Sequence, residues 1–188
     1  DSNPRLIEAY EGVQRNVEQV IALLEQHQAR HSEEHYYQVR AEVPDDKIAC
    51  AARLIYLNRT CFNGLYRENS KGEFNVPMGR YAKLSLPAPE HFRAVSELLQ
   101  GTELTTCDFG TLMERARATD HVYCDPPYVP LSETASFTGY CKEPFGHPEQ
   151  QRLAAAAKQA GARGARVVLS NHDLPVVRHE LYREADGF

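Results

Sequence analysis

Hydrophobic side chains recur every three or four residues along the first part of the chain, which is the spacing of one face of an α-helix. The pattern begins after Asn3-Pro4, where Asn can cap a helix and Pro suits its first turn. It predicts a helix of about six turns, whose buried face comprises Leu6, Ile7, Tyr10, Val13, Val17, Val20, Ile21 and Leu24.

A polar stretch follows, in which His27, His31 and His35 lie four residues apart. On a helix this spacing places three imidazoles on one face, and imidazole is a common metal ligand. No carboxylate or cysteine supports a metal site, so the solvated end of a helix is the favoured interpretation.

A second hydrophobic stripe predicts a helix that begins at Asp45-Asp46 and ends at Asn63-Gly64. Its buried positions are Ile48, Ala51, Ala52 and Ile55. Residues 65–76 then change to the pattern of a β-hairpin, with Gly72 at the position that needs a positive φ. Prolines and a glycine make residues 77–89 a loop.

Helices and strands alternate in the rest of the chain. We expect strands at Thr102–Phe109, His121–Cys124 and Ala165–Leu169, and helices at 89–100, 111–118, 149–159 and 173–185. Such alternation is typical of βαβ units with a parallel sheet, so the predicted fold class is α/β. Residues 1–11 and 88–188 are expected to form this part, and residues 12–87 a separate subdomain.

The overall composition is ordinary, and only one segment, residues 53–83, has an unusual balance of charges. Of the residues, 42% are hydrophobic and 25% charged, as in ordinary globular proteins. Five widely spaced cysteines without a C-x-x-C pair indicate reduced thiols and a cytosolic location. The net charge is −5, yet residues 53–83 hold six basic side chains against two acidic ones. A local basic patch of this kind is suited to phosphates.

The residues with the clearest chemical signal are Asp125-Pro126-Pro127-Tyr128, after the strand His121–Cys124. Two prolines end the strand and fix an acid and an aromatic ring at its carboxyl end, where open α/β sheets bind ligands. The Asp125 carboxylate and the Pro126 carbonyl can accept both N–H groups of an exocyclic amine, and Tyr128 can stack on its ring. The alternative is a strand end with a plain Pro-Pro turn.

Other candidates carry weaker signals. Asp1, before a helix, can hold ribose hydroxyls or simply favour the helix start. His172-Asp173 can be half of a catalytic pair, but without a G-x-S-x-G motif a capping Asp is favoured. The chain has neither a P-loop nor G-x-G-x-x-G. The basic hairpin can enter the major groove of DNA, or be a surface hairpin with solvated charges.

Several blocks of the sequence resemble DNA adenine methyltransferases of the Dam type, in that family's order and over nearly the whole chain. The most specific block runs from Tyr56-Leu57-Asn58-Arg59 through Phe62-Asn63-Gly64-Leu65-Tyr66-Arg67 to Gly79-Arg80-Tyr81. The others are Asp1–Ile7, Asp125–Tyr128 and Ser170-Asn171-His172-Asp173.

The resemblance implies a Rossmann-like fold with a target-recognition insertion made of helices and a hairpin. It also implies an enzyme that uses S-adenosylmethionine to form N6-methyladenine in double-stranded DNA, typically within GATC. Such a protein is expected to be a monomer without a metal, in a bacterial cytoplasm or encoded by a phage.

Roles for individual residues follow from matching positions in the resemblance. Asp125, Pro126, Pro127 and Tyr128 would form the catalytic turn around a flipped adenine. The cofactor would contact Asp1 at its ribose, Asp108 and Phe109 at its adenine, and Asp125. Arg67 would read a guanine, and the remaining DNA contacts would come from Arg59, Phe62, Asn63, Leu65, Asn69, Asn75, Arg80 and Tyr81.

The chain also departs from the family. Nothing matches the family's N-terminal aromatic–Gly-x-Gly loop with its cofactor-contacting lysine, and no final hairpin follows the last helix. We therefore expect a fragment that binds the cofactor poorly and is inactive alone. Two other functions stay open, namely an RNA or protein amine methyltransferase, and a DNA-binding remnant without catalysis.

Overall fold

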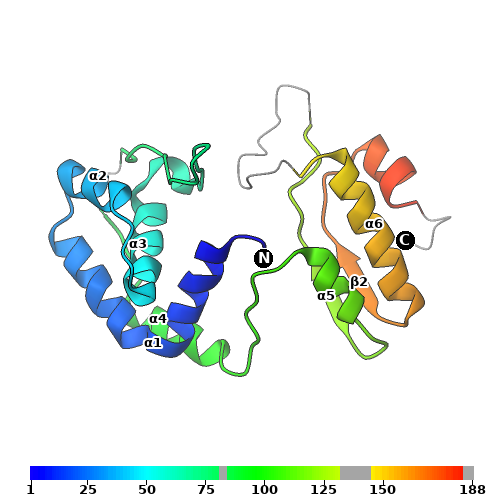
Figure 1. Cartoon of the computed structure of the whole chain (residues 1–188), viewed down its shortest axis with the longest axis horizontal. Helices are drawn as coiled ribbons and strands as arrows, with labels where there is room; N and C mark the ends of the chain where they lie inside the picture. Colours follow the sequence, from blue (N-terminus) through cyan, green and yellow to red (C-terminus); the bar gives the residue numbers. More distant parts are fainter. Residues whose placement is uncertain (81–83, 132–144, 184–188) are drawn as a thin grey trace. The chain divides into compact units, whose positions relative to one another are not determined.

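The computed structural model describes residues 1–80, 84–131 and 145–183 and divides into two compact units (Figure 1). Unit 1 comprises Asp1 and Asn3–Thr106, and unit 2 comprises Ser2 and Cys107–Phe188. The boundary in packing therefore falls after Thr106, whereas the sequence predicts that residues 1–11 and 88–188 form one part and residues 12–87 another. The compact units do not show which residues bind DNA or the cofactor, so the division expected from the sequence stays a prediction.

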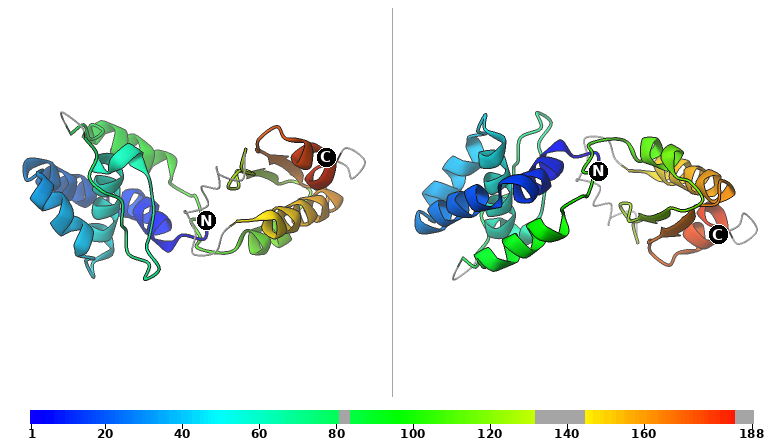
Figure 2. Two further views of the ribbon diagram at one scale, coloured as in Figure 1. Left: turned by 90° about the horizontal axis from the view of Figure 1, so that it is seen from above. Right: turned by 90° about the horizontal axis from the view of Figure 1, so that it is seen from below.

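Unit 1 is built from four helices, namely α1 (Pro4–Ala29), α2 (Glu33–Ala41), α3 (Lys47–Thr60) and α4 (Pro89–Leu98). The predicted caps of α1 and α3 are confirmed, because Asn3 accepts the N–H groups of Arg5 and Leu6, and Asp46 accepts that of Ala49. Helix α1 packs against α3 and α4 (Figures 1 and 2). A Cβ on Gly12 would lie 2.6 Å from Ala51 Cβ, so only glycine permits this approach of α1 to α3.

Helix α2 corrects the prediction of a solvated helix end. Ser32 accepts the N–H of His35 and starts a new helix, and Tyr36 and Val39 on that helix are buried. Arg53 of α3 donates to the carbonyl oxygens of Val39 and Arg40, both at 2.7 Å, which satisfies the end of α2. Arg53 is thus a packing residue rather than part of an exposed basic patch.

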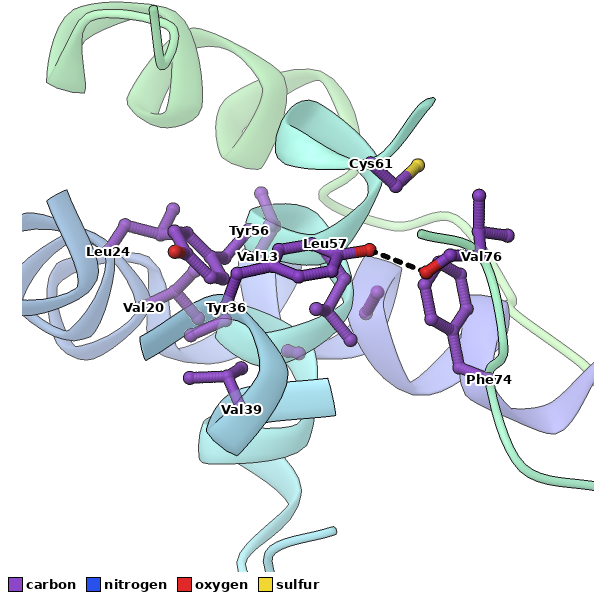
Figure 3. Packing of buried hydrophobic residues seen from close by; sticks show 13 residues of the cluster. Val13, Val20, Leu24, Tyr36, Val39, Tyr56, Leu57, Cys61, Phe74 and Val76 are labelled. Atoms are coloured by element: carbon purple, nitrogen blue, oxygen red, sulfur yellow. Dashed lines mark hydrogen bonds between the residues drawn. The ribbon is translucent and has the colours of Figure 1, made fainter. Parts of the chain in front are cut away.

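The core of unit 1 joins the helices to the hairpin. Tyr36, Tyr56, Leu57, Val20 and Val76 are almost completely buried (Figure 3). The hydroxyl of Tyr36 donates to the carbonyl of Val76 at 2.9 Å, so α2 holds the returning arm of the hairpin. The hairpin position is therefore set by the helical core.

The predicted hairpin is present, although its pairing is sparse. Helix α3 ends at Thr60, and a short 3-10 helix, η1 (Phe62–Gly64), follows it. Antiparallel bridges then join Cys61 to Met78 and Glu68 to Phe74. Gly72 has φ +78° at the tip, as predicted.

Unit 2 contains a parallel pair of strands, β1 (His121–Cys124) and β2 (Arg166–Leu169), paired from His121↔Arg166 to Cys124↔Leu169. Helices α5 (Phe109–Arg115) and α6 (His147–Ala162) cover one face of the pair (Figure 2). Small buried side chains of α6, Ala157 and Ala160, let the helix lie close to the strands. The predicted βαβ unit is confirmed for this pair.

Two other predictions for this half are wrong. Thr102–Phe109 is not a strand, because no strand pairs with it among the described residues, and Asp108 instead caps α5. The last predicted helix is reduced, within the described residues, to a short π-helical segment, η3 (Val177–Leu181). Asp173 does not cap it by hydrogen bonding but forms an ion pair with Arg178.

Candidate functional site

The parallel strands bring two loop segments together at their carboxyl ends. Asp125-Pro126-Pro127-Tyr128, the catalytic turn of the sequence prediction, follows β1 directly, and Ser170 follows β2. The backbone N–H of Ser170 donates to the carbonyl of Cys124 at 3.0 Å, which extends the pairing beyond the strands. The Ser170 hydroxyl donates to the Asp125 carboxylate and so fixes one side of the acid.

A buried glutamine holds the middle of the turn. Gln150 lies near the start of α6 with 2% of its surface exposed. Its Nε2 donates to the carbonyl oxygen of Pro127 at 2.7 Å, and its Oε1 accepts from Asn171 Nδ2 at 3.1 Å. The hydroxyl of Tyr182 also lies 3.3 Å from Oε1. Gln150 therefore connects the turn to the segment after β2 and to the segment after η3.

Backbone groups determine which way both amides point. The carbonyl of Pro127 only accepts, so the nitrogen of the Gln150 amide must face it. The N–H groups of Val129 and His172 only donate, and they lie 3.0 and 2.9 Å from Asn171 Oδ1. Asn171 must then turn its nitrogen toward Gln150. All members of the network are satisfied in one arrangement, which favours a rigid site.

The ring of Tyr128 lies beside the ring of His172, with centroids 5.0 Å apart and planes at 82°. His172 Nδ1 lies 2.7 Å from the carbonyl oxygen of Val129, and because that oxygen only accepts, Nδ1 carries the hydrogen. Tyr128 keeps 40% of its surface exposed, so part of the ring is available to a planar ligand. His172 thus supports an aromatic ring, and among the described residues its recorded contacts include no nucleophilic side chain.

The Asp125 carboxylate is exposed at the end of β1. Among the described residues no hydrogen bond uses the carbonyl of Pro126. The turn therefore presents two acceptor groups, a carboxylate and a carbonyl, on a segment whose position is fixed by Ser170 and Gln150. This arrangement can accept the N–H groups of an amine.

Asp108 and Phe109 lie at the start of α5, against Arg152 of α6. Asp108 accepts from the N–H of Gly110 and from both terminal nitrogens of Arg152, at 2.8, 2.8 and 2.7 Å. The Arg152 guanidinium holds the pKa of the Asp108 carboxyl below its usual range and lies 3.9 Å from the centroid of the Phe109 ring. Arg152 thus contacts both residues, and the Phe109 ring also packs against the core of unit 2, so their predicted contact with an adenine stays a prediction.

Asp1 belongs to unit 1 and stabilises the start of α1. Its Oδ1 accepts the N–H of Asn3 at 2.7 Å, and its backbone nitrogen lies 3.2 Å from the carbonyl oxygen of Thr105. These contacts fit the helix-start role that the sequence allows. The predicted role at a ribose stays a prediction.

The hairpin of unit 1 presents some predicted contact residues and uses others internally. Arg67 is exposed and its Nε donates to Asn75 Oδ1 at 2.7 Å, from the opposite arm. Asn69 Oδ1 accepts the N–H groups of Lys71 at 2.9 Å and Glu73 at 3.0 Å, so this side chain builds the tip. The arms thus orient one arginine, and the tip depends on one asparagine.

The other predicted contact residues that the structure describes lie near the base of the hairpin. Phe62 is 48% exposed, Asn63 has φ +53°, and Leu65 packs against the core. Arg59 donates to the carbonyl of Ser85 at 3.0 Å, and Arg80 is exposed. Tyr81 lies outside the described residues.

The histidines at the end of α1 and in α2 gather around Tyr56. His27 Nδ1 and His35 Nε2 lie 3.1 Å apart, and His31 Nδ1 lies 2.8 Å from the Tyr56 hydroxyl. The described part of the chain contains no group of three or more such side chains arranged to hold a metal ion. The rings of all three histidines pack against the ring of Tyr56, with centroids 4.8, 5.8 and 5.7 Å from it. A separate finding concerns membranes: no described helix has the length and apolarity needed to cross one.

Sequence reasoning missed Gln150, Ser170 and Asn171 as members of the site. Ser170 and Asn171 were visible only as part of a family-like block after a predicted strand. Only their position directly after a predicted strand could have indicated a role in the site, because the carboxyl ends of neighbouring parallel strands meet at one edge of a sheet. Gln150 carries no local signal at all, since a glutamine in an Ala-rich helix normally faces solvent.

Comparison with known proteins identifies the family to which the chain is similar. The model of the protein family described as D12 class N6 adenine-specific DNA methyltransferase matches residues 1–186. The match includes both compact units and all the site residues named above.

Individual relatives are similar over most of the chain. The type II methyltransferase M1.LlaDCHI of Lactococcus lactis subsp. cremoris is 41% identical over 192 residues, 98% of this chain and 67% of that protein. The type II methyltransferase M.MjaIII of Methanocaldococcus jannaschii is 43% identical over 143 residues, 73% and 50% of the two chains. The DNA adenine methylase of Escherichia coli K12 is 42% identical over 156 residues, 81% and 55% of the two chains. The chain thus spans between half and about two thirds of these three proteins.

Proposed function

Because the chain belongs to the D12 class N6 adenine-specific DNA methyltransferase family, we propose that the full-length protein methylates N6 of adenine in duplex DNA, within GATC, using S-adenosylmethionine. The observation that carries this proposal is the exposed Asp125 carboxylate, held by the Ser170 hydroxyl at the carboxyl end of β1. Binding alone would not require an acid at this place.

The chemistry follows from the nature of the amine. The lone pair of an adenine amino group is delocalised into the ring, so the nitrogen is a poor nucleophile. In the proposed complex the Asp125 carboxylate and the Pro126 carbonyl accept its two N–H bonds, which directs the lone pair outward. Bound S-adenosylmethionine supplies an electrophilic methyl group.

The target base must leave the stack to reach such a turn. Tyr128 would then offer its exposed ring area to the flipped adenine, while His172 keeps the tyrosine ring in place. The edge-to-face contact of the two rings supports this role, because it leaves ring surface of Tyr128 open.

We propose that unit 2 is part of a Rossmann-like fold and contributes Phe109 and Asp125 to the cofactor site. The role of Asp1 at the ribose stays a prediction from the resemblance. The exposed carboxylate of Asp125 and the aromatic ring of Phe109 fit a ligand with amine and purine groups. The Asp108 carboxylate fits it less well, because Arg152 and Gly110 already bond it.

In the proposed complex the hairpin of unit 1 contacts the DNA. Arg67 would read a guanine in the major groove, since its Nε bonds Asn75 and, among the described residues, no hydrogen bond uses its terminal nitrogens. Phe62, Asn63 and Leu65 would contact base pairs. The remaining contacts, to phosphates or bases, would come from Arg59, Asn69, Asn75, Arg80 and Tyr81.

The test is methyl transfer from radiolabelled S-adenosylmethionine by the full-length protein. The substrates are a duplex with GATC, the same duplex with that site scrambled, and a structured RNA. We expect label in the GATC duplex alone. Label in RNA would overturn the assignment to DNA, and equal label in the scrambled duplex would overturn GATC specificity. GATC-specific binding without transfer would leave only a recognition function.

A further inference from the structure

We propose that Gln150 is a positioning residue for methyl transfer, which holds the Asp125–Tyr128 turn through a single hydrogen bond to the carbonyl of Pro127. The proposal rests on the proposed function, since it assigns Gln150 a role in the same reaction. It gives a purpose to a buried amide on α6 that touches none of the groups expected to meet the substrate.

The turn needs an outside donor because of its own composition. Pro126 and Pro127 have no N–H groups, so the middle of the turn cannot be held by its own backbone donors. The carbonyl oxygens of the two prolines are the only backbone groups at this point that can form hydrogen bonds. Gln150 Nε2 bonds the second of them at 2.7 Å, while among the described residues no hydrogen bond uses the first.

Gln150 itself has little freedom to move. It is 2% exposed, its backbone N–H bonds the carbonyl of Gly146 at 3.1 Å, and its Oε1 accepts from Asn171 and lies beside the Tyr182 hydroxyl. A buried amide with both ends bonded keeps one orientation, because turning it would leave donors facing donors and an acceptor facing an acceptor.

The same amide reaches the far end of the turn through Asn171. Asn171 Oδ1 accepts the N–H of Val129 at 3.0 Å, one residue beyond Tyr128. Gln150 therefore sets the turn on both sides of Tyr128, directly at Pro127 and indirectly at Val129. A displacement of about 1 Å at reacting groups can cost about a hundredfold in rate, so the position of this amide matters to catalysis.

The most informative variant is Gln150→Glu in the full-length protein. It keeps the size of the side chain and replaces the donor nitrogen that faces the Pro127 carbonyl with an acceptor oxygen. An ionised carboxylate still accepts from Asn171 and Tyr182 but repels the Pro127 carbonyl. We expect the single-turnover rate of methyl transfer to a GATC duplex to fall about tenfold or more at pH 8, with the Kd for the duplex within about threefold. The matched control is Gln151→Glu, at the exposed neighbouring position, which should keep the original rate.

A pH profile separates positioning from loss of folding. When the introduced carboxyl is protonated it can donate to the Pro127 carbonyl as the amide did, and burial favours the protonated form. We expect the deficit of Gln150→Glu relative to the unaltered protein to shrink as the pH falls from 8 to 6. A rate equal to that of the unaltered protein, or a deficit that does not change with pH, would overturn the proposal.

Hydrogen exchange at the backbone amide of Val129 provides a readout without catalysis. We expect Gln150→Glu to speed this exchange at least about tenfold, since the turn that carries Val129 loses its bond at the Pro127 carbonyl and can move away from Asn171, and Gln151→Glu to leave it unchanged. Unchanged exchange at Val129 would overturn the positioning role. If the unaltered protein transferred no methyl group to adenine, the proposed function would fail, whereas the exchange result would still decide how Gln150 acts on the turn.

Discussion

At the scale of single residues, the orientation of the Asp125 carboxylate depends on one hydroxyl group, that of Ser170. The Ser170 hydroxyl lies close to the carboxylate and 3.3 Å from the carbonyl oxygen of Cys124. A hydroxyl has a single hydrogen, and the shorter contact is with the charged acceptor, so the carboxylate receives it. Asp125 thereby gains a fixed orientation while remaining exposed.

We predict that Ser170→Ala lowers the methyl transfer rate of the full-length protein by about three- to tenfold, because the carboxylate loses a charge-assisted hydrogen bond worth about 1 kcal/mol at an exposed site. Affinity for the GATC duplex should not change. Ser170→Thr keeps the hydroxyl and should keep most of the rate. Equal rates for Ser170→Ala and the unaltered protein would show that Asp125 needs no such support.

His27 shows how one side chain can make the stability of unit 1 depend on pH. Burial, with His35 and Arg30 nearby, lowers the pKa of His27 to about 4. Burial also lowers the pKa values of His31 and His35. An unfolded histidine titrates near about 6.5, so between these values the folded state binds fewer protons than the unfolded state. Stability is therefore complete above about pH 6.5 and falls as the pH drops toward 4.

We predict that His27→Gln reduces this loss by about 2 kcal/mol between pH 7.5 and pH 4.5, a value that allows for solvent screening of the partly exposed ring. Thermal melting at the two pH values measures it. The matched control is His91→Gln on α4, an exposed histidine, which should follow the unaltered protein. Parallel loss of stability in His27→Gln and the unaltered protein would contradict the assignment.

At the scale of elements, the hairpin of unit 1 depends on a few local bonds. Two isolated bridges join its arms, Asn69 builds its tip, and Asn75 bonds Arg67 across it. The core holds the base of both arms, through Leu65 and Tyr66 on the outgoing arm and Phe74 and Val76 on the returning arm. A change in backbone conformation at the tip is therefore expected to displace the hairpin side chains that are predicted to contact DNA. It should affect the stability of unit 1 less.

We predict that Gly72→Ala weakens binding of the full-length protein to a GATC duplex by about three- to tenfold. Gly72 has φ +78°, where a side chain costs about 1–2 kcal/mol. Gly101→Ala is the matched control, because Gly101 has φ +77° after α4 and a Cβ there meets nothing within 4 Å. Duplex titrations should separate the two variants, and equal affinities would exclude a role for the hairpin tip in DNA binding.

The elements that sequence predicts well are those whose signal is local. The stripe of α1, the cap at Asp46 and the apolar run of β1 each appear within one segment, and each is present in the structure. Helix α2 was missed because two apolar residues, Tyr36 and Val39, are a weak periodic signal among charged neighbours. The strand expected at Thr102–Phe109 fails because a strand also needs a neighbour, which no single segment reveals.

At the scale of the whole molecule, the family match extends over both compact units. The catalytic turn could be proposed from sequence because Asp125 to Tyr128 are contiguous. Its supports could not, because Ser170, Asn171 and Gln150 meet it only after β1 pairs with β2 and α6 crosses over them. The roles of Asp1 and of the hairpin residues in ligand binding stay predictions.

The central claim is that Asp125 accepts a hydrogen bond from the amine that is methylated. The most direct measurement is the amount of N6-methyladenine formed in a GATC duplex by the full-length protein and by Asp125→Ala in a single turnover, with duplex affinity measured in parallel. The account predicts a rate lower by about a hundredfold or more in Asp125→Ala with little change in affinity. A rate within about threefold of the unaltered protein would contradict it.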